Sequence, residues 1–285
     1  MIISVASGKG GTGKTTVAVN LALSLNDAQL VDCDVEEPNV HLFIMPEITE
    51  KKSAYIPIPE VDKDTCNYCD ICRQVCAYNA IVVIPPRVNK KGTVLIYPEL
   101  CHGCGACTLL CPQKAMIEID KEIGIIEIGG KGNLQFIQGK LNIGEAMSPP
   151  LIRQVKKHIN TNKTVIIDAP PGTSCPVITA VKGSDFCVLV TEPTPFGLND
   201  LALTVDVVRE LKVPFGVVIN RAAIGNDGVE QYCEKEGIPI LMKIPFDRKI
   251  AEAYSQGTPM VTILPDYKIS FQGLFDTITM MTQKV

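Results

Sequence analysis

Short apolar segments alternate with amphipathic segments along most of the chain. Residues 2–7 form an apolar run that predicts a buried strand, and Val17, Leu21 and Leu25 then share one face of a helix over residues 15–25. A second apolar run, residues 28–34, ends in two aspartates. The alternation predicts parallel βαβ units, so we expect an α/β fold built on a doubly wound, mostly parallel sheet. Further strands are predicted at residues 164–170, 185–193, 215–221 and 238–245, and helices near 176–182, 198–211, 227–236, 247–256 and 269–283.

The pattern changes between residues 57 and 120, where prolines flank two groups of four cysteines. Apolar segments at residues 55–60 and 115–120 predict a strand that enters this stretch and a strand that leaves it. The segments that begin at Cys66 and Cys101 share the spacing C-x2-C-x2-C-x3-C, and each continues into a short helical turn and an apolar strand. This internal duplication indicates a small pseudo-symmetric α+β module. We therefore expect residues 57–120 to be a domain inserted into a discontinuous α/β domain formed by residues 1–56 and 121–285.

Composition narrows the class of protein. Hydrophobic residues make up 46% of the 285 residues and charged residues 20%, which is enough for a sizeable core. The formal net charge is −4 with no basic run, and Trp is absent, so we expect no nucleic-acid partner and no membrane partner. The start of the chain lacks the layout of a signal peptide, which favours a soluble cytoplasmic protein. In a reducing compartment, twelve cysteines indicate metal binding rather than disulfides.

A glycine-rich segment between the first strand and the first helix fits the phosphate-loop pattern G-x-x-x-x-G-K-[ST]. Glycines let successive backbone N–H groups surround phosphate oxygens at a helix N-terminus. Lys14 is expected to reach the β- and γ-phosphates of ATP or ADP, and the Thr15 hydroxyl to bind Mg²⁺. The alternative is a glycine-rich turn that binds nothing. The expected nucleotide-binding residues of this P-loop are Gly8, Lys9, Gly10, Gly11, Thr12, Gly13, Lys14, Thr15 and Thr16.

Three aspartates end predicted strands that follow the same direction through the sheet. Asp32 and Asp34 close the second strand, and Asp168 closes another and is followed by Pro-Pro-Gly. Because parallel strands end at one edge of a sheet, these carboxylates are expected to meet beside the phosphate loop. Asp168 is expected to hold Mg²⁺ with Thr15. Each aspartate alone has a plainer explanation, since strand-end Asp residues commonly cap turns.

The segment GKGGTGKTT resembles the deviant Walker A motif of the MinD/ParA/Mrp/nitrogenase-iron-protein ATPases. The resemblance implies that Lys9 reaches the nucleotide of a partner subunit, although spacing alone is equally consistent with a solvated lysine. It also implies that Asp34 orients the attacking water, that Asp32 assists the metal, and that Asn220 and the Pro245–Asp247 loop contact the adenine. On this resemblance the chain is a slow, Mg²⁺-dependent ATPase. Its catalytic residues would be Lys9, Lys14, Asp34 and Asp168.

The cysteine spacing is typical of iron–sulfur ligation. The first three cysteines of each motif bind three irons of one [4Fe–4S] cluster, and the fourth cysteine binds an iron of the other cluster. The module resembles a bacterial two-[4Fe–4S] ferredoxin, with Ala77 standing where proline is usual. Two structural zinc ions are the alternative, although zinc sites usually pair separated C-x2-C knuckles. The expected ligand sets are Cys66, Cys69, Cys72 and Cys111 for one cluster, and Cys101, Cys104, Cys107 and Cys76 for the other.

The leading hypothesis joins the two motifs. We expect an ATP-binding and ATP-hydrolysing protein that couples its nucleotide state to electron transfer, or to metallocluster assembly, on a partner protein. Its assembly is expected to be a nucleotide-dependent homodimer or a dimer with a paralogue. Cys175 suggests a metal shared between subunits, although a free or buried thiol is the simpler interpretation. The alternatives are a partition-type positioning ATPase with structural clusters, and a plain ferredoxin-type electron carrier.

Overall fold

Residues 1–283 are described in the computed structural model, and the chain divides into two units. The larger unit comprises Met1–Lys52, Ile126–Lys140 and the chain from Ile152 onward. The smaller unit comprises Ser53–Ile125 together with Leu141–Leu151. The sequence predicted an insertion at residues 57–120. In the structure the smaller unit extends a few residues beyond each of these boundaries, and it also includes a second segment, residues 141–151.

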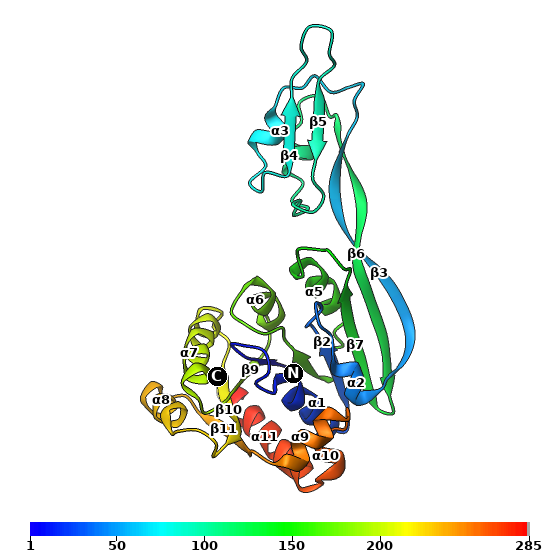
Figure 1. Ribbon diagram of the computed structural model, residues 1–285. Coiled ribbons are helices and arrows are strands. Elements are labelled where there is room, and N and C mark those ends of the chain that lie inside the picture. The colour runs from blue at the N-terminus through cyan, green and yellow to red at the C-terminus, as the bar shows by residue number, and fades with distance from the viewer. Residues whose placement is uncertain (284–285) are drawn as a thin grey trace. The chain divides into compact units, whose positions relative to one another are not determined.

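The larger unit is built on a mostly parallel sheet, as predicted. From β11 to β7 the neighbouring strands pair in parallel, in the order β11-β10-β9-β1-β8-β2-β7, and β6 and β3 complete the sheet (Figure 1). The order places β1 and β2 on either side of β8, so that their ends lie at one edge of the sheet. The strands are β1 (Ile2–Ala6), β2 (Ala28–Asp32), β3 (Glu47–Val61), β6 (Met116–Lys131), β7 (Leu134–Leu141), β8 (Thr164–Asp168), β9 (Phe186–Thr191), β10 (Phe215–Ala222) and β11 (Ile240–Pro245).

Helices cover the sheet and bury its apolar side chains. Helix α1 packs against α11, and Leu21 on α1 and Phe271 on α11 are both fully buried in the core. Helices α6 and α7 pack against β1 and β9 respectively. The helices outside residues 57–120 are α1 (Lys14–Ser24), α2 (Val40–Ile44), α5 (Pro149–Lys156), α6 (Cys175–Val181), α7 (Pro195–Glu210), α8 (Gly228–Glu236), α9 (Arg248–Ser255), α10 (Met260–Ile263) and α11 (Asp266–Thr282).

Strands β3 and β6 are longer than the sequence indicated, and β7 was not predicted. The sequence predicted only short strands around residues 55–60 and 115–120, and none at β7. The first half of β3 is largely exposed and rich in charged residues, so it lacks the alternation that identifies a strand. Gly129 allows β6 to lie close to β3, because a Cβ there would overlap the carbonyl oxygen of Glu47.

A buried carboxylate holds these edge strands together. Glu127 on β6 pairs with Lys51 on β3 at 2.7 Å and with Lys140 on β7 at 2.9 Å, and it also accepts a hydrogen bond from Gln138. Burial alone would raise the pKa of Glu127, but the hydrogen bonds from Lys51, Lys140 and Gln138 outweigh it and lower the pKa to about 2. The carboxylate is therefore ionised in the folded protein.

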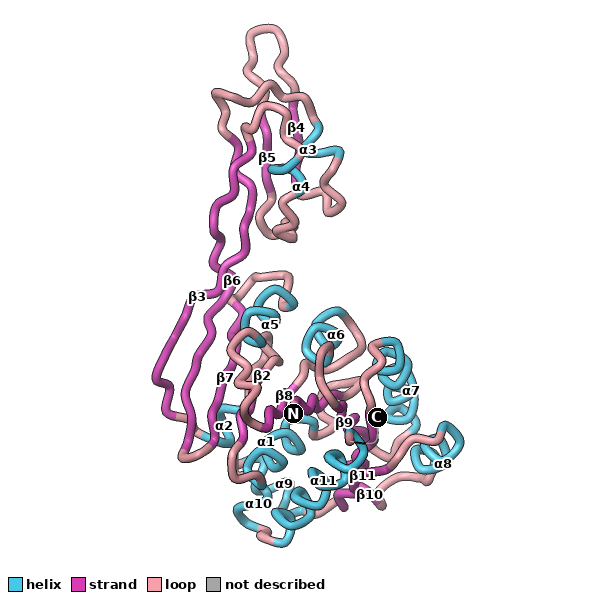
Figure 2. The backbone as a smooth tube through the Cα atoms, turned by 180° about the vertical axis from the view of Figure 1, so that it is seen from behind, coloured by secondary structure: helices cyan, strands magenta, loops and turns pink. Residues whose placement is uncertain are grey.

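The smaller unit is a two-stranded antiparallel sheet with two short helices (Figure 2). Strand β4 (Ile81–Ile84) pairs with β5 (Thr93–Ile96), and the helices are α3 (Ile71–Gln74) and α4 (Ala106–Leu109). Ile81 and Met116 form its small core together with the thiols of Cys72 and Cys107. Among the described residues, no helix combines the length and the apolar character that crossing a membrane would require.

Candidate functional site: a phosphate loop and two cysteine cavities

The phosphate loop joins β1 to α1 and depends on its glycines. Gly11 and Gly13 have φ angles of 81° and 92°, which favour glycine over any residue with a side chain. A Cβ at Gly13 would overlap the amide nitrogen of Asn220, which donates a hydrogen bond to the carbonyl oxygen of Thr12 at 2.8 Å. A Cβ at Gly8 would likewise overlap the backbone of Asp200. The loop is thus held tightly between β10 and α7.

Lys14 lies at the centre of a buried charged cluster. Its Nζ is 3.1 Å from Asp168 and 3.6 Å from Asp34, and the Thr15 hydroxyl donates to Asp168 at 2.6 Å. Burial lowers the pKa of Lys14, but the charges of Asp168 and Asp34 outweigh it, so the net pKa is raised and the lysine stays positive. The structure therefore brings together the four side chains that the P-loop and strand-end patterns predicted.

Asp34 has a perturbed carboxyl group. Burial raises its pKa to about 6, although the positive charge of Lys14 opposes this shift, while Asp168 and Glu37 add to it. A carboxylate with a pKa near neutrality beside a phosphate site has the chemistry of a group that accepts a proton from water.

Asp32 is held by backbone hydrogen bonds at the end of β2. It is fully buried, and its two oxygens accept hydrogen bonds from the backbone N–H groups of Asp34 at 3.0 Å and of Asn39 and Val40 at 3.1 Å. Burial and the negative charge of Asp168 raise its pKa well above the usual range. Asp32 therefore positions the loop that carries Asp34.

A cleft of about 370 Å³ opens beside the loop. Two parts of its lining were predicted from the sequence. They are the phosphate loop, with Lys9 and Thr16, and the segment from Pro245 to Asp247. Asn220 also lines it. The sequence interpretation missed Glu37, Asn39, Arg221 and one face of α9, formed by Ile250, Ala251 and Tyr254. The i, i+1, i+4 spacing on α9 was the available signal for the last three.

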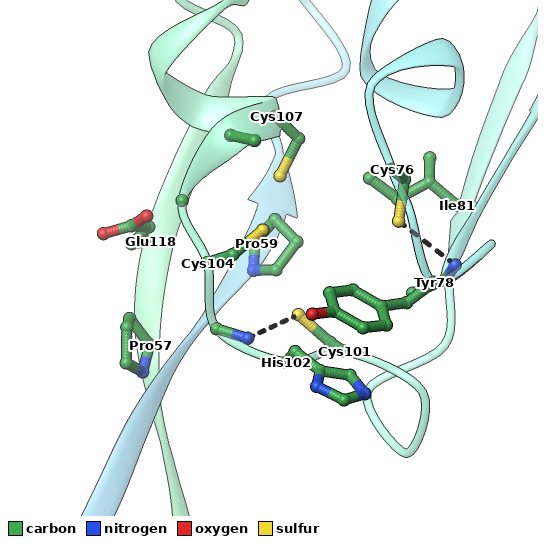
Figure 3. Close-up of a pocket in the computed structure, with 14 residues that line it drawn as sticks. Pro57, Pro59, Cys76, Tyr78, Ile81, Cys101, His102, Cys104, Cys107 and Glu118 are labelled. Atoms are coloured by element: carbon green, nitrogen blue, oxygen red, sulfur yellow. Dashed lines mark hydrogen bonds between the residues drawn. The ribbon is translucent and has the colours of Figure 1, made fainter. Parts of the chain in front are cut away.

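The eight clustered cysteines surround two cavities in the smaller unit. Figure 3 shows the cavity in which Cys76 faces the loop from Cys101 to Cys107. In each cavity, three cysteines of one motif meet the fourth cysteine of the other, which is the grouping that the spacing predicted. One cavity is lined by Cys66, Cys69, Cys72 and Cys111, and the other by Cys76, Cys101, Cys104 and Cys107.

Backbone N–H groups point at the sulfur atoms in both cavities. Ala115 donates to Cys111 and Ala80 donates to Cys76, each at 3.3 Å. Tyr68 and Gly103 donate to the first cysteine of each motif, at 3.4 and 3.5 Å. Four thiols with N–H donors aimed at sulfur fit an iron–sulfur cluster in each cavity. Among residues 1–283, no three His, Cys, Asp or Glu side chains are grouped as they would be around one metal ion.

Comparison with known proteins identifies the family of the chain. A model of the CobQ/CobB/MinD/ParA nucleotide-binding domain matches residues 3–260. The chain belongs to this family. An uncharacterized protein of Methanocaldococcus jannaschii is 33% identical over 265 residues, which cover 90% of each chain. An iron-sulfur cluster carrier protein of Pyrococcus furiosus is 28% identical over 278 residues, covering 91% of this chain and 78% of that protein.

Solved structures of MinD and ParA proteins share the fold. The cell division ATPase MinD of Pyrococcus furiosus aligns with a TM-score of 0.59 and 21% identity over 98% of each chain. A plasmid partition protein of Borrelia burgdorferi bound to AMPPNP aligns with a TM-score of 0.55 and 16% identity, covering 100% of this chain and 99% of that one. The predicted α/β fold of the MinD/ParA type is confirmed.

The remaining cysteines of this MinD/ParA family member are scattered. Cys33, Cys187 and Cys233 are buried. Cys175 is exposed as the first residue of α6. No other cysteine lies beside it in a metal-binding group within the described part of the chain.

Proposed function

We propose that this protein is an ATPase whose nucleotide state controls a two-cluster electron-transfer module. The observation that carries the proposal is the presence, in one chain, of a P-loop cluster with Lys14, Thr15 and Asp168 in contact and of two cavities with four cysteines each. Neither a pure electron carrier nor a pure positioning ATPase needs both. The acceptor is a partner protein in the cytoplasm, the clusters are resident cofactors, and ATP is the substrate.

The nucleotide site supplies binding and proton transfer. Lys14 neutralises the β- and γ-phosphates of ATP, and Thr15 and Asp168 hold Mg²⁺, which draws charge from the phosphates. Lys14 and Thr15 both donate hydrogen bonds to Asp168 in the structure, so nucleotide binding exchanges those contacts for contacts with phosphate and metal. Asp34 orients a water molecule for attack and takes its proton, which its raised pKa favours.

The smaller unit supplies redox chemistry. Its eight cysteines hold two [4Fe–4S] clusters, which accept and release single electrons. The ligand sets are Cys66, Cys69, Cys72 and Cys111 for one cluster and Cys76, Cys101, Cys104 and Cys107 for the other. The backbone N–H donors stabilise negative charge on the sulfur atoms.

Metal analysis and EPR test the proposal directly. Anaerobically reconstituted protein should contain about eight irons and matching acid-labile sulfide per chain. The EPR signal of the reduced clusters should change on addition of MgATP, and the Lys14→Ala variant should show the clusters without the change. Two zinc ions without sulfide would contradict the cluster assignment. A cluster signal indifferent to MgATP would contradict the coupling.

Cluster delivery is a second candidate, favoured by the name of the Pyrococcus furiosus relative. In that case MgATP should promote transfer of iron and sulfide to an apo acceptor protein, with loss of the donor's EPR signal. Electron transfer predicts instead that iron content stays constant through repeated cycles of ATP hydrolysis. Iron analysis of donor and acceptor after separation distinguishes the two functions.

A further inference from the structure

The internal duplication lets each cysteine cavity serve as the reference for the other. Residues that stand at the same sequence separation from the fourth cysteine of their motif correspond to each other. Ala80 thus corresponds to Ala115, and Ile81 to Met116. Ala80 and Ile81 line one cavity, and Ala115 and Met116 line the other. Differences at corresponding places therefore show where the two cluster sites depart from symmetry.

Two of the differences lie at the solvent side of the cavities. Tyr78 and His102 line one cavity, and their rings stack with centroids 3.4 Å apart and planes 6° apart (Figure 3). The corresponding residues of the other cavity are Gln113 and Asn67, which carry amides. One cluster site is thus flanked by an aromatic pair, while the other is flanked by groups that hydrogen-bond and attract water.

The third difference is a charge. Glu118 lines the cavity with the aromatic pair, and its Oε1 would be 3.0 Å from a Cβ at Gly105, between two of the cluster cysteines. The corresponding residue in the other cavity is Val83. That cavity also contains Asp70, but Arg73 pairs with it through two hydrogen bonds of 2.7 and 2.5 Å.

The charge of Glu118 is not neutralised by a neighbour in the described chain. No ion pair or hydrogen bond of its carboxylate occurs among residues 1–283. The positive charge of Lys121 acts on the Cys101 thiol, but this ammonium group already pairs with Glu145 at 2.9 Å. An unpaired carboxylate beside a cluster opposes the negative charge that reduction adds, and therefore lowers the reduction potential.

We infer that Glu118 makes the two clusters unequal, an inference that rests on the proposed function. The cluster in the Glu118 cavity has the lower potential, and a single electron given to the module passes from it to the other cluster. This transfer oxidises the cluster in the Glu118 cavity and reduces the other cluster, and no proton moves. The electron thus comes to rest on the cluster held by Cys66, Cys69, Cys72 and Cys111.

An EPR-monitored redox titration of the reconstituted full-length protein tests the inference. Dithionite serves as reductant, and the titration is run at low ionic strength, where screening of the Glu118 charge is weakest. Wild type should show two midpoint potentials. Glu118→Gln should raise the lower midpoint potential by about 59 mV, which is a tenfold change in the equilibrium constant for one electron. The higher midpoint potential should stay unchanged.

Two further variants make the result specific. Glu118→Val, which copies the corresponding Val83, should shift the same midpoint in the same direction. Asp120→Asn removes an equal charge from an exposed residue farther along β6 that does not line the cavity, and should shift the midpoint less. A shift of the higher midpoint, equal shifts with Asp120→Asn, or no shift would overturn the inference. Absence of two clusters would instead contradict the proposed function.

Discussion

Single residues in the nucleotide site are placed by close backbone contacts as much as by charge. Gly13 is confined by Asn220 and by its positive φ, whereas Gly10 in the same loop has open space around its Cα. The two glycines therefore have different tolerance for a side chain, although both belong to the same sequence pattern. The difference depends on Asn220, which is distant in sequence, and so a motif alone does not reveal it.

Gly13→Ala should abolish tight MgATP binding, because the new methyl group displaces Asn220 and strains the loop. Backbone strain alone costs about 1–2 kcal/mol for a residue with a side chain in the left-handed region. Gly10→Ala, at a position where a Cβ would meet no protein atom within 4 Å, is the matched comparison and should lose much less MgATP affinity than Gly13→Ala. Isothermal titration calorimetry of both variants checks this. Equal losses in the two variants would contradict the assigned contacts.

Asp34 should make the stability of the nucleotide-free protein depend on pH. Its pKa is raised from 3.8 to about 6, so the folded state binds the proton more tightly than the unfolded state, and stability falls as pH rises through this window. Relative to Asp34→Asn, wild type should lose about 1 kcal/mol of unfolding free energy between pH 5 and pH 7.5.

Urea unfolding followed by circular dichroism, in the presence of EDTA, measures this difference. Asp34→Asn should also lose ATP hydrolysis while it retains ATP binding, since the amide takes no proton from water. If wild type instead gained stability relative to the variant as pH rises, the raised pKa of Asp34 would be contradicted.

At the scale of elements, periodicity predicted the parallel strands and most of the helices well, because a core on both faces of a sheet leaves continuous apolar runs. The predicted helix over 247–256 is α9 (Arg248–Ser255), for example. Strands β3 and β6 were predicted only in part, because many of their positions are exposed and their apolar pattern is weak over much of their length. Pairing across such strands depends on partners that are distant in the sequence.

Glu127→Gln should weaken these edge strands. Loss of the carboxylate leaves two lysines without their partner, and a hydrogen-bonded charge of this kind contributes about 2 kcal/mol. The folded-state pKa is about 2, below the ordinary 4.5, so the contribution is complete above pH 4.5 and is lost as pH falls toward 2.

The difference in unfolding free energy between wild type and Glu127→Gln should therefore narrow by about 1 kcal/mol when pH is lowered from 7 to 4. Denaturant titrations at the two pH values measure it. Glu122→Gln, on the same strand with no ion pair among the described residues, is the control and should leave stability nearly unchanged. A difference that widens at low pH would contradict the role given to Glu127.

For the whole molecule, the sequence predicted that one domain interrupts another, because the cysteine duplication and the P-loop pattern each define a unit of their own. The grouping of the eight cysteines also followed from spacing. What spacing did not reveal is the asymmetry of the cavities, which depends on which side chains fold against each cysteine loop. Glu118 has no distinguishing pattern in the sequence, and its place beside Gly105 comes from the path of β6.

Assembly is the remaining property at this scale, and it depends on Lys9. This lysine lines the cleft and forms no ion pair within the described residues, so its charge is available to a nucleotide or to a partner subunit. If Lys9 contacts the nucleotide of a second copy, a ligand held by both subunits binds the dimer better and must shift association toward the dimer. MgATP should then promote a dimer.

Analytical ultracentrifugation of Asp34→Ala, which should bind ATP without hydrolysing it, tests this expectation. MgATP should convert the variant from monomer to dimer, and the Lys9→Ala/Asp34→Ala protein should remain monomeric while it still binds MgATP. Lys157→Ala/Asp34→Ala removes a lysine that does not line the cleft, and should dimerise normally. Because Lys14 contacts Asp168 and Asp34 within its own subunit, its loss would abolish binding and could not separate the two roles. Dimerisation that survives loss of Lys9, or that ignores MgATP, would show that Lys9 acts within one subunit.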